Sequence, residues 1–415
     1  MEEVKTNWIF ALLLCLFCPV SILFLGGNGI ISFLLIFCSF VILITKRPKI
    51  NLTKAEKWFV YSMVLFPTIT LISMWLHASD SYKYFDNPSR LLLALGVFFA
   101  IRAIYVKVSY FYYSIVLGAI LIGSIALYQS QFEGIYRVYG YISHPPNPIT
   151  FGNAAMMLGI MSVFTFSALK EHLGWYAILL VGLAVILGVL GSLLSGTRGG
   201  WISLPILVAI ISYWTFGRRK RYQFFSLIFV LVFFFLASLT MPVVGDRISA
   251  AYFEIIQIMQ GRWIGGSVGT RLQMWYAAIL AFWESPFIGV GLGQYFEFKK
   301  ELVEAGLVKS NISSFPYAHN ELLHYLAEMG LLGFIPLVLL YFGWLYLPSK
   351  YTSQVGKTRD LAYMALSIAV FRIDIGLTEV QFNYHFTSVF YVMLFVITAG
   401  FMCRPAKDSE LGTKQ

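Results

Sequence analysis

About twelve apolar runs, each long enough to cross a lipid bilayer as a helix, dominate this sequence. Such a crossing takes about 20 predominantly apolar residues. Hydrophobic residues make up 59% of the chain and charged residues 12%, which is more apolar surface than a soluble domain of this size can bury. We therefore predict an all-α polytopic membrane protein. Its membrane helices are expected at 8–25, 29–45, 58–76, 91–106, 109–128, 151–169, 174–194, 200–216, 223–241, 330–348, 361–377 and 385–403.

The basic residues predict the orientation of these helices, because Lys and Arg prefer short cytoplasmic loops. Most of them gather in alternate loops, such as 46–57 and 217–221. The asymmetry predicts that both termini are cytoplasmic. It also explains the net charge of +10 through topology and contact with anionic membrane lipids, so nucleic acid is not expected as a partner. The short loops on the outer side hold only Lys83, Arg90, Arg137 and Arg198.

One long segment, residues 242–329, separates the ninth and tenth predicted helices on the outer side. Loops of this length are seldom structureless, and parts of it, such as 247–260 and 271–286, have helical spacing. We expect three regions. These are 1–241 with membrane helices 1–9, 242–329 as a helical outer subdomain, and 330–415 with helices 10–12 and a short cytoplasmic tail.

Neither a metal ion nor a cofactor is expected from the sequence. His319 and His324 lie five residues apart and would point away from each other on a helix, whereas zinc-binding pairs use a spacing of four. The chain has no nucleotide-binding loop of the form GxxxxGK[ST]. The four cysteines fall within apolar runs and lack the spacing of a zinc or disulfide framework.

Two arginines of the outer side are candidates for binding an anion. Arg198 lies in "SGTRGGW", where Gly196, Gly199 and Gly200 remove side chains and would let a bulky ligand approach. The alternative is an interfacial arginine that reaches toward lipid headgroups. Arg271 begins an amphipathic helical pattern, and alone it could equally be a solvated surface residue.

The stretch "AHNELLHYLAEMGLLGF" places a histidine at a helix start, on the boundary between water and membrane. Asn320 is expected to cap the helix, and Glu321 suits its first turn. A neutral imidazole at His319 could take a proton from an acceptor hydroxyl, although a lone histidine usually has a structural role.

Further polar residues near the outer face have both a functional and a structural interpretation. Arg137 and Asn147 belong to a Pro-rich loop that enters the sixth helix, and a rigid turn is about as plausible there as a substrate contact. Arg372 and Asp374 are costly at membrane depth, so they should line a polar cavity or pair with each other. Glu379 follows at the outer mouth.

Taken together, these segments resemble the bacterial O-antigen ligase family. The resembling pieces follow one another over roughly residues 130 to 380. They are "RVYGYISHPPNPITFGNAAM", "SGTRGGW", "GTRLQMW…SPFIGVGLGQYF", "AHNELLHYLAEMGLLGF" and "GLTEV".

The resemblance implies a glycosyltransferase of the Gram-negative inner membrane, with its active site facing the periplasm. Its donor would be O-antigen on undecaprenyl diphosphate, and its acceptor a sugar hydroxyl of lipid A-core. Arg198 and Arg271 would hold the diphosphate, and His319 would be the base of an inverting single displacement. Arg137, Asn147, Asn320, Arg372 and Glu379 are possible substrate contacts, and Glu379 stands where an Asp is expected in this family.

Two other functions remain open at this point. An O-antigen polymerase would share the donor and most of the chemistry but would transfer to another lipid-linked repeat unit. A transporter or flippase for lipid-linked sugars would also need outer arginines, but no internal repeat with paired broken helices is evident.

Overall fold

The structure, a computed structural model, describes residues 7–78, 81–144, 146–217, 219–260 and 266–405. Over these residues it consists of helices and short connections, without strands, which confirms the all-α fold class. The long helices are α1 (Trp8–Leu23), α2 (Gly27–Lys46), α3 (Lys54–Leu76), α4 (Lys83–Ala103), α5 (Ser109–Gln131), α6 (Pro148–Leu173), α7 (Tyr176–Ser195), α8 (Leu204–Phe216), α9 (Lys220–Thr240), α10 (Pro242–Met259), α11 (Ser267–Glu284), α13 (Glu321–Ser349), α14 (Gly356–Thr378) and α15 (His385–Met402). Shorter helices are η1 (Gly199–Trp201), α12 (Tyr295–Glu304), η2 (Ser310–Ile312) and η3 (Gln381–Asn383).

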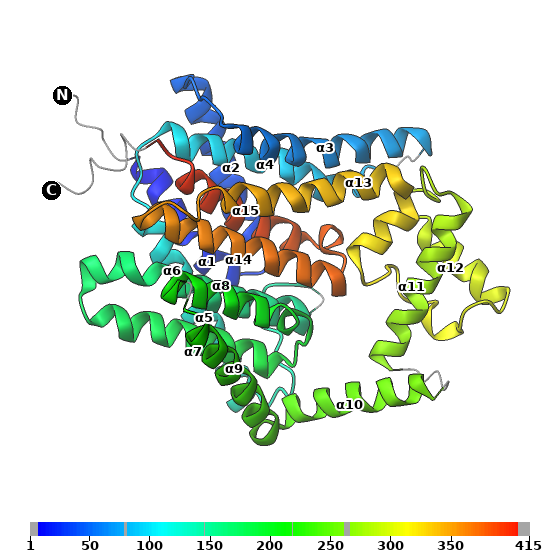
Figure 1. Cartoon of the computed structure of the whole chain (residues 1–415). Helices are drawn as coiled ribbons and strands as arrows, with labels where there is room; N and C mark the ends of the chain where they lie inside the picture. Colours follow the sequence, from blue (N-terminus) through cyan, green and yellow to red (C-terminus); the bar gives the residue numbers. More distant parts are fainter. Residues whose placement is uncertain (1–6, 79–80, 145, 218, 261–265, 406–415) are drawn as a thin grey trace.

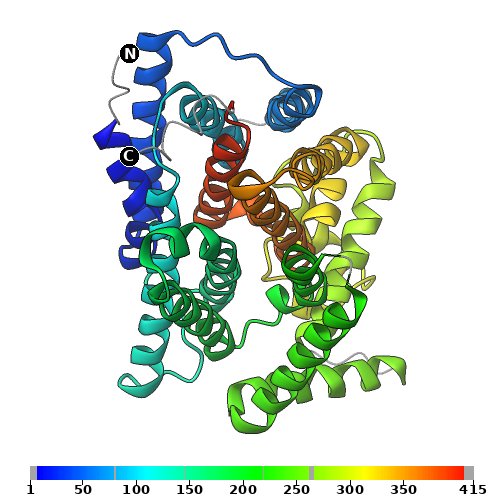
Figure 2. The ribbon, with the colours of Figure 1, turned by 60° about the vertical axis from the view of Figure 1, so that its left-hand side comes forward.

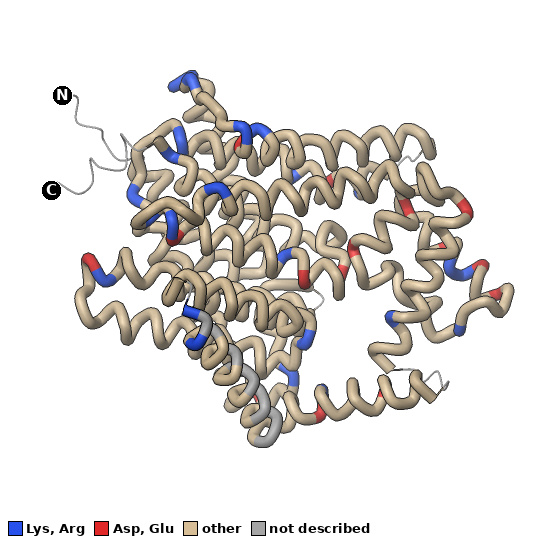
Figure 3. The backbone as a smooth tube through the Cα atoms, in the orientation of Figure 1, with Lys and Arg blue, Asp and Glu red and all other residues tan. Residues whose placement is uncertain are grey.

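The membrane character of the chain follows from the lengths and apolarity of these helices. Among the described residues, 9 helices are long and apolar enough to span a bilayer, so this is a multi-pass membrane protein. The other predicted segments fall on α1, α4 and α9, and a total of twelve stays a prediction. Figure 3 shows Lys and Arg mainly toward the two ends of the long helices, with long uncharged stretches between them.

Helix α15 forms the centre of the bundle. Every residue of α15 from Phe386 to Met402 is buried, because α2, α4 and α14 pack around it. Helix α14 in turn contacts α6, α8 and α13. Figure 2 shows α14 and α15, in orange and red, between the N-terminal helices and the green helices α8 to α10.

The predicted outer segment is helical, as expected for 247–260 and 271–286, which fall largely within α10 and α11. Figure 1 shows α10, α11 and α12 together at one end of the bundle. We refer to this as the α11 end. The division of the chain into 1–241, 242–329 and 330–415 remains a prediction.

A break in α13 joins this segment to the bundle. The helix begins at Glu321, earlier than the predicted membrane segment, and Gly330 interrupts it with a φ of 58°. The amides of Leu331 and Leu332 donate instead to the carbonyls of Pro286 and Phe287, each at 2.9 Å. A Cβ on Gly330 would lie 2.6 Å from the Phe287 carbonyl carbon, so only glycine fits here. The turn after α11 is thereby fastened to α13, close to the helix start that carries His319.

Candidate functional site

His319 and Glu379 meet at the α11 end of the bundle. His319 precedes α13 and Glu379 follows α14, and the His319 Nδ1 lies 2.5 Å from Glu379 Oε1. Both side chains are largely buried, at 17% and 6% exposed. The backbone of His319 has a φ of 48°, an uncommon conformation for a residue other than glycine, and one that clusters at functional sites. A carboxylate in this position orients an imidazole.

Asn320 fixes the position of His319 relative to α14. Its Oδ1 accepts from the Leu323 amide at 3.1 Å, which confirms the predicted helix cap. Its Nδ2 donates to the Leu377 carbonyl at 3.2 Å. The side chain therefore ties the start of α13 to the end of α14, two residues before Glu379.

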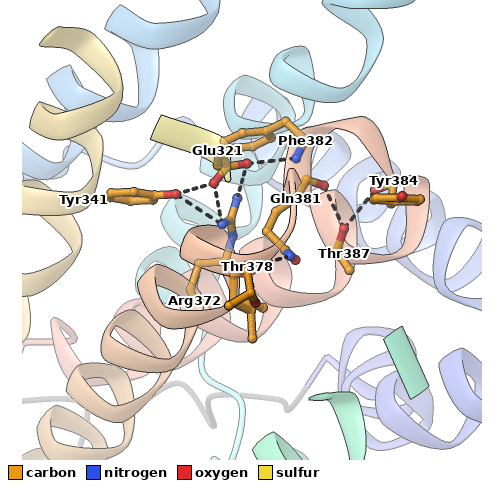
Figure 4. Close-up of polar contacts among 9 residues, drawn as sticks. Glu321, Tyr341, Arg372, Thr378, Gln381, Phe382, Tyr384 and Thr387 are labelled. Atoms are coloured by element: carbon orange, nitrogen blue, oxygen red, sulfur yellow. Dashed lines mark hydrogen bonds and ion pairs between the residues drawn. The ribbon is translucent and has the colours of Figure 1, made fainter. Parts of the chain in front are cut away.

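A closed ion-pair network involves Glu321, the first residue of α13 (Figure 4). The Glu321 carboxylate accepts hydrogen bonds from Arg372 Nη1 at 2.8 Å, Arg372 Nη2 at 3.3 Å and the Phe382 amide at 3.0 Å. The Tyr341 hydroxyl also donates to Glu321. Every member is buried, and Arg372 is 1% exposed. The network holds the 379–384 loop against α13 and α14, and with it Glu379.

Of the two alternatives for Arg372 and Asp374, pairing with each other is wrong. Arg372 turns toward Glu321 on α13, whereas Asp374 Oδ2 accepts from the Ser203 amide at 2.9 Å. Two residues apart on a helix, the two side chains do not face each other. The sequence indicates only a first-turn role for Glu321. It does not show that the partner of this carboxylate is Arg372, 51 positions away.

The two predicted anion-binding arginines lie close enough to influence each other. Burial lowers the pKa of Arg198, and the charges of Arg247, Arg271 and Arg137 lower it further, against the opposing effect of Glu254. Arg198 Nη1 donates to the Arg247 carbonyl at 2.6 Å, and Nη2 to Ser267 Oγ at 2.9 Å. The guanidinium thus links the loop after α7 to α10 and α11.

Arg271 connects this cluster to the His319 site. Burial lowers its pKa, Glu379 raises it, and Arg247 lowers it again. Arg271 therefore senses Glu379 on one side and the other arginines on the opposite side. The three residues Arg198, Arg271 and His319, far apart in sequence, converge through these neighbours.

Arg247 was not identified from the sequence, although it belongs to the same cluster. It lies on α10, and its charge lowers the pKa of Arg137, Arg198 and Arg271 alike. Its Nε is buried and finds no hydrogen-bond partner within the described part of the chain. The only available signal was a lone Arg in an amphipathic helical pattern. We call Arg137, Arg198, Arg247 and Arg271 the arginine cluster.

Arg137 and Asn147 both make local contacts. Arg137 Nε donates to the Ser195 carbonyl at 3.1 Å, which places it against the loop of Arg198. Asn147 caps α6 by accepting from the Ile149 amide at 2.9 Å, so this helix starts at Pro148, earlier than the predicted 151. Asn147 also lines a cavity of about 630 Å³.

The glycines around Arg198 serve close packing of protein segments, which corrects the expectation that they leave room for a ligand. A Cβ on Gly199 would lie 2.7 Å from Thr378 Oγ1, and one on Gly200 2.7 Å from Asn153 Oδ1. A Cβ on Gly196 would lie 3.3 Å from Arg137 Nε. The "SGTRGG" loop is thus pressed against α6 and the end of α14.

The described residues contain no group of three or more His, Cys, Asp or Glu side chains arranged to hold a metal ion. The chemistry that this site offers is a histidine paired with a carboxylate, next to a group of cations. The expectation that the protein needs no metal or cofactor stays a prediction.

Comparison with known proteins gives a partial match. Residues 183–338 match the family described as O-antigen ligase. Over this part, the chain is similar to the O-antigen ligase family. The matched residues run from α7 into α13 and include Arg198, Arg247, Arg271 and His319, while Glu379 lies beyond them. An uncharacterized protein of Haemophilus influenzae is 27% identical over 342 residues, which cover 82% of this chain and 84% of that protein.

The match supports a membrane glycosyltransferase of the ligase or polymerase type. It supports in general terms a lipid-linked glycan and lipid A-core as partners.

Proposed function

We propose that the protein transfers O-antigen polysaccharide from undecaprenyl diphosphate to a sugar hydroxyl of lipid A-core. The reaction takes place at the periplasmic face of the Gram-negative inner membrane, with both termini in the cytoplasm. The observation that carries this proposal is the contact between His319 and Glu379 beside the arginine cluster.

The arginine cluster is suited to the leaving group. As the glycosidic bond to the diphosphate breaks, negative charge accumulates on the phosphate oxygens, and fixed cations stabilise that charge most in a partly buried site. Arg198 and Arg271 are assigned to the two phosphates, since guanidinium groups match phosphate oxygens in geometry. The mutual repulsion of the arginines is relieved when the anion binds.

His319 is assigned as the general base. Glu379 beside Nδ1 favours the tautomer with its proton on that nitrogen, which leaves Nε2 free to accept a proton. An acceptor hydroxyl on the face opposite the diphosphate loses its proton to Nε2 as its oxygen bonds to the anomeric carbon. The departing diphosphate takes the electron pair of the old bond, and the anomeric centre is inverted.

The test is lipopolysaccharide gel analysis of a null strain complemented with wild type, His319→Ala, Arg198→Ala or Arg271→Ala at matched membrane levels. Lys170→Ala, an exposed basic residue on α6, is the matched control. We expect the wild type and the control to restore the polymer ladder on core. The three site variants should leave long polymer on the lipid carrier.

Three outcomes contradict parts of this assignment. Loss of long polymer itself in the null strain, with single repeat units still reaching the core, identifies an O-antigen polymerase. Accumulation of lipid-linked glycan that stays inaccessible from the periplasm identifies a flippase. Full activity of His319→Ala removes His319 from the role of base.

A further inference from the structure

An apolar groove runs along the surface between α2, α4 and α15. It encloses about 330 Å³, within the range of small-molecule sites. Its walls include Phe33, Phe37 and Leu93, which are 65%, 57% and 42% exposed, together with Val392 and Met393 of α15. The groove is therefore open to the bilayer and shaped by three helices.

One end of the groove is polar. Arg90 Nη1 donates to Ser388 Oγ at 3.1 Å, and its Nη2 pairs with Asp86 at 2.6 Å. Lys83 lies three residues before Asp86 and Arg90 four after it, so the three share a face of α4 on which positive charge prevails. Ser32 Oγ also lines the groove, is buried, and has no hydrogen-bond partner among the described residues.

This polar end continues toward His319 and Glu379. Gly29 and His385 line both the groove and the cavity of about 630 Å³ that contains Asn147. Tyr384 lines the same cavity, and its pKa is raised by burial and then by the charge of Glu379. The groove and the cavity are therefore adjacent, and Tyr384 of the cavity lies within electrostatic reach of Glu379.

The arginine cluster approaches Glu379 from a different side. Its residues belong to α10, α11 and the loops before α6 and after α7, whereas α2 and α4 form the groove. Helix α15 packs on α2 and α4, and α14 packs on α6, α8 and η1, so the pair α14 and α15 separates the two (Figure 2). An inverting transfer needs this arrangement, because the acceptor must attack from the face opposite the leaving group.

We propose that the groove between α2, α4 and α15 binds the acyl chains of a phosphorylated glycolipid acceptor, with its phosphate at Arg90 and its glycan directed through the cavity toward His319. This inference rests on the proposed function, because it assigns a site to that reaction's acceptor. The exposed phenylalanines accommodate hydrocarbon. The basic end of the groove is complementary to an anionic headgroup.

The experiment compares transfer by the purified protein to two acceptors, the intact glycolipid and the same molecule with its acyl chains removed. Leu93→Trp fills the groove, and Arg90→Gln removes the charge at its end. Each variant should raise the KM for the intact acceptor about tenfold. The KM for the donor should not change in either variant. The rate with the deacylated acceptor should not change in Leu93→Trp, whereas Arg90→Gln should raise the KM for the deacylated acceptor as well, because that molecule keeps its phosphate. Leu183→Trp, an exposed position on α7, is the matched control and should behave as wild type.

Photocrosslinking supplies a second measurement. A photoreactive phenylalanine analogue at Phe37 should capture the intact glycolipid. Capture of the polyprenyl donor, or of bulk phospholipid alone, overturns the inference. Equal losses with both acceptors in Leu93→Trp, or unchanged kinetics in Leu93→Trp and Arg90→Gln, also overturn it. Absence of transfer to either acceptor by the wild type contradicts the proposed function instead, and the crosslink then reports on the groove independently.

Discussion

Arg372 and the arginine cluster both lie near the α11 end of this bundle, and they differ in how their charge is balanced. Arg372 is enclosed with Glu321, Tyr341 and the Phe382 amide, and it is bonded at short distances. The members of the arginine cluster lower one another's pKa, against the opposing effects of Glu254 and Glu379. The first group is complete without a ligand, whereas we propose that the second receives an anion.

The difference shows how a buried charge signals its role. A cation whose counter-charge belongs to the same chain stabilises one arrangement of helices. Cations held together against their own repulsion have a cost that an anionic substrate can offset. Burial alone does not distinguish the two groups, but the identity of the nearest charges does.

The largest expected effect is on the closed network. Glu321→Gln should lower the free energy of unfolding by about 3–5 kcal/mol, because it leaves the Arg372 charge buried without a counter-charge. The double variant Glu321→Met with Arg372→Met should regain most of this loss, since an apolar pair of similar volume is often neutral. Thermal unfolding of the purified proteins measures both. A single variant as stable as wild type would contradict the structural role of the pair.

The arginine cluster should show the reverse behaviour, with a loss of activity and no loss of stability. Arg271→Met should reduce glycan transfer by about 10²- to 10³-fold, as expected for loss of one group that stabilises transition-state charge. Its thermal stability should be unchanged or higher, because a repelling charge is removed. Lys170→Met serves as the exposed control. A loss of stability parallel to the loss of activity would show that Arg271, like Arg372, has a structural role.

A smaller effect is expected at Arg247. Arg247→Gln should raise the KM for the lipid-linked donor about tenfold and leave kcat nearly unchanged, because it removes one charge that acts at a distance on the diphosphate. The measurement is initial rate against donor concentration, with Arg219→Gln, an exposed arginine before α9, as the control. An unchanged KM would show that Arg247 does not contribute to binding of the donor.

The smallest effect concerns a lone buried cation, Lys299 on α12. Burial lowers the pKa of Lys299 to about 8 from its ordinary value of 10.5. Between these values the unfolded chain binds more protons than the folded one, so stability should rise with pH from about 8 to 10.5. Lys299→Met should remove this rise. Chemical denaturation at several pH values measures it, and an equal slope in both proteins would contradict the assignment.

The sequence was informative about local structure. The apolar runs predicted the helices, because the side chains of each run must be buried in the protein or face lipid along the whole run. The cap at Asn320 was predicted because capping depends on side chains within three residues.

The sequence was less informative about pairings across the chain. Glu321 and Arg372 lie on different helices, and no local spacing shows that they meet. Arg247 looks like any surface arginine until α10 brings it against the loop of Arg198. The glycines beside Arg198 suggested an opening for a ligand, whereas the fold uses them for close packing. Each error concerns a contact that exists only after the helices assemble.

The pair of Glu321 and Arg372 also has a consequence for biogenesis. An arginine within a membrane helix is costly to insert, by about 2.5–3.5 kcal/mol at the helix centre on the translocon scale. Glu321 is synthesised before Arg372, so α13 can offer a counter-charge when α14 enters the bilayer. The same docking event joins Asn320 to Leu377 and brings Glu379 to His319. A chain that inserts α14 correctly has therefore also aligned its candidate base with the carboxylate that orients it.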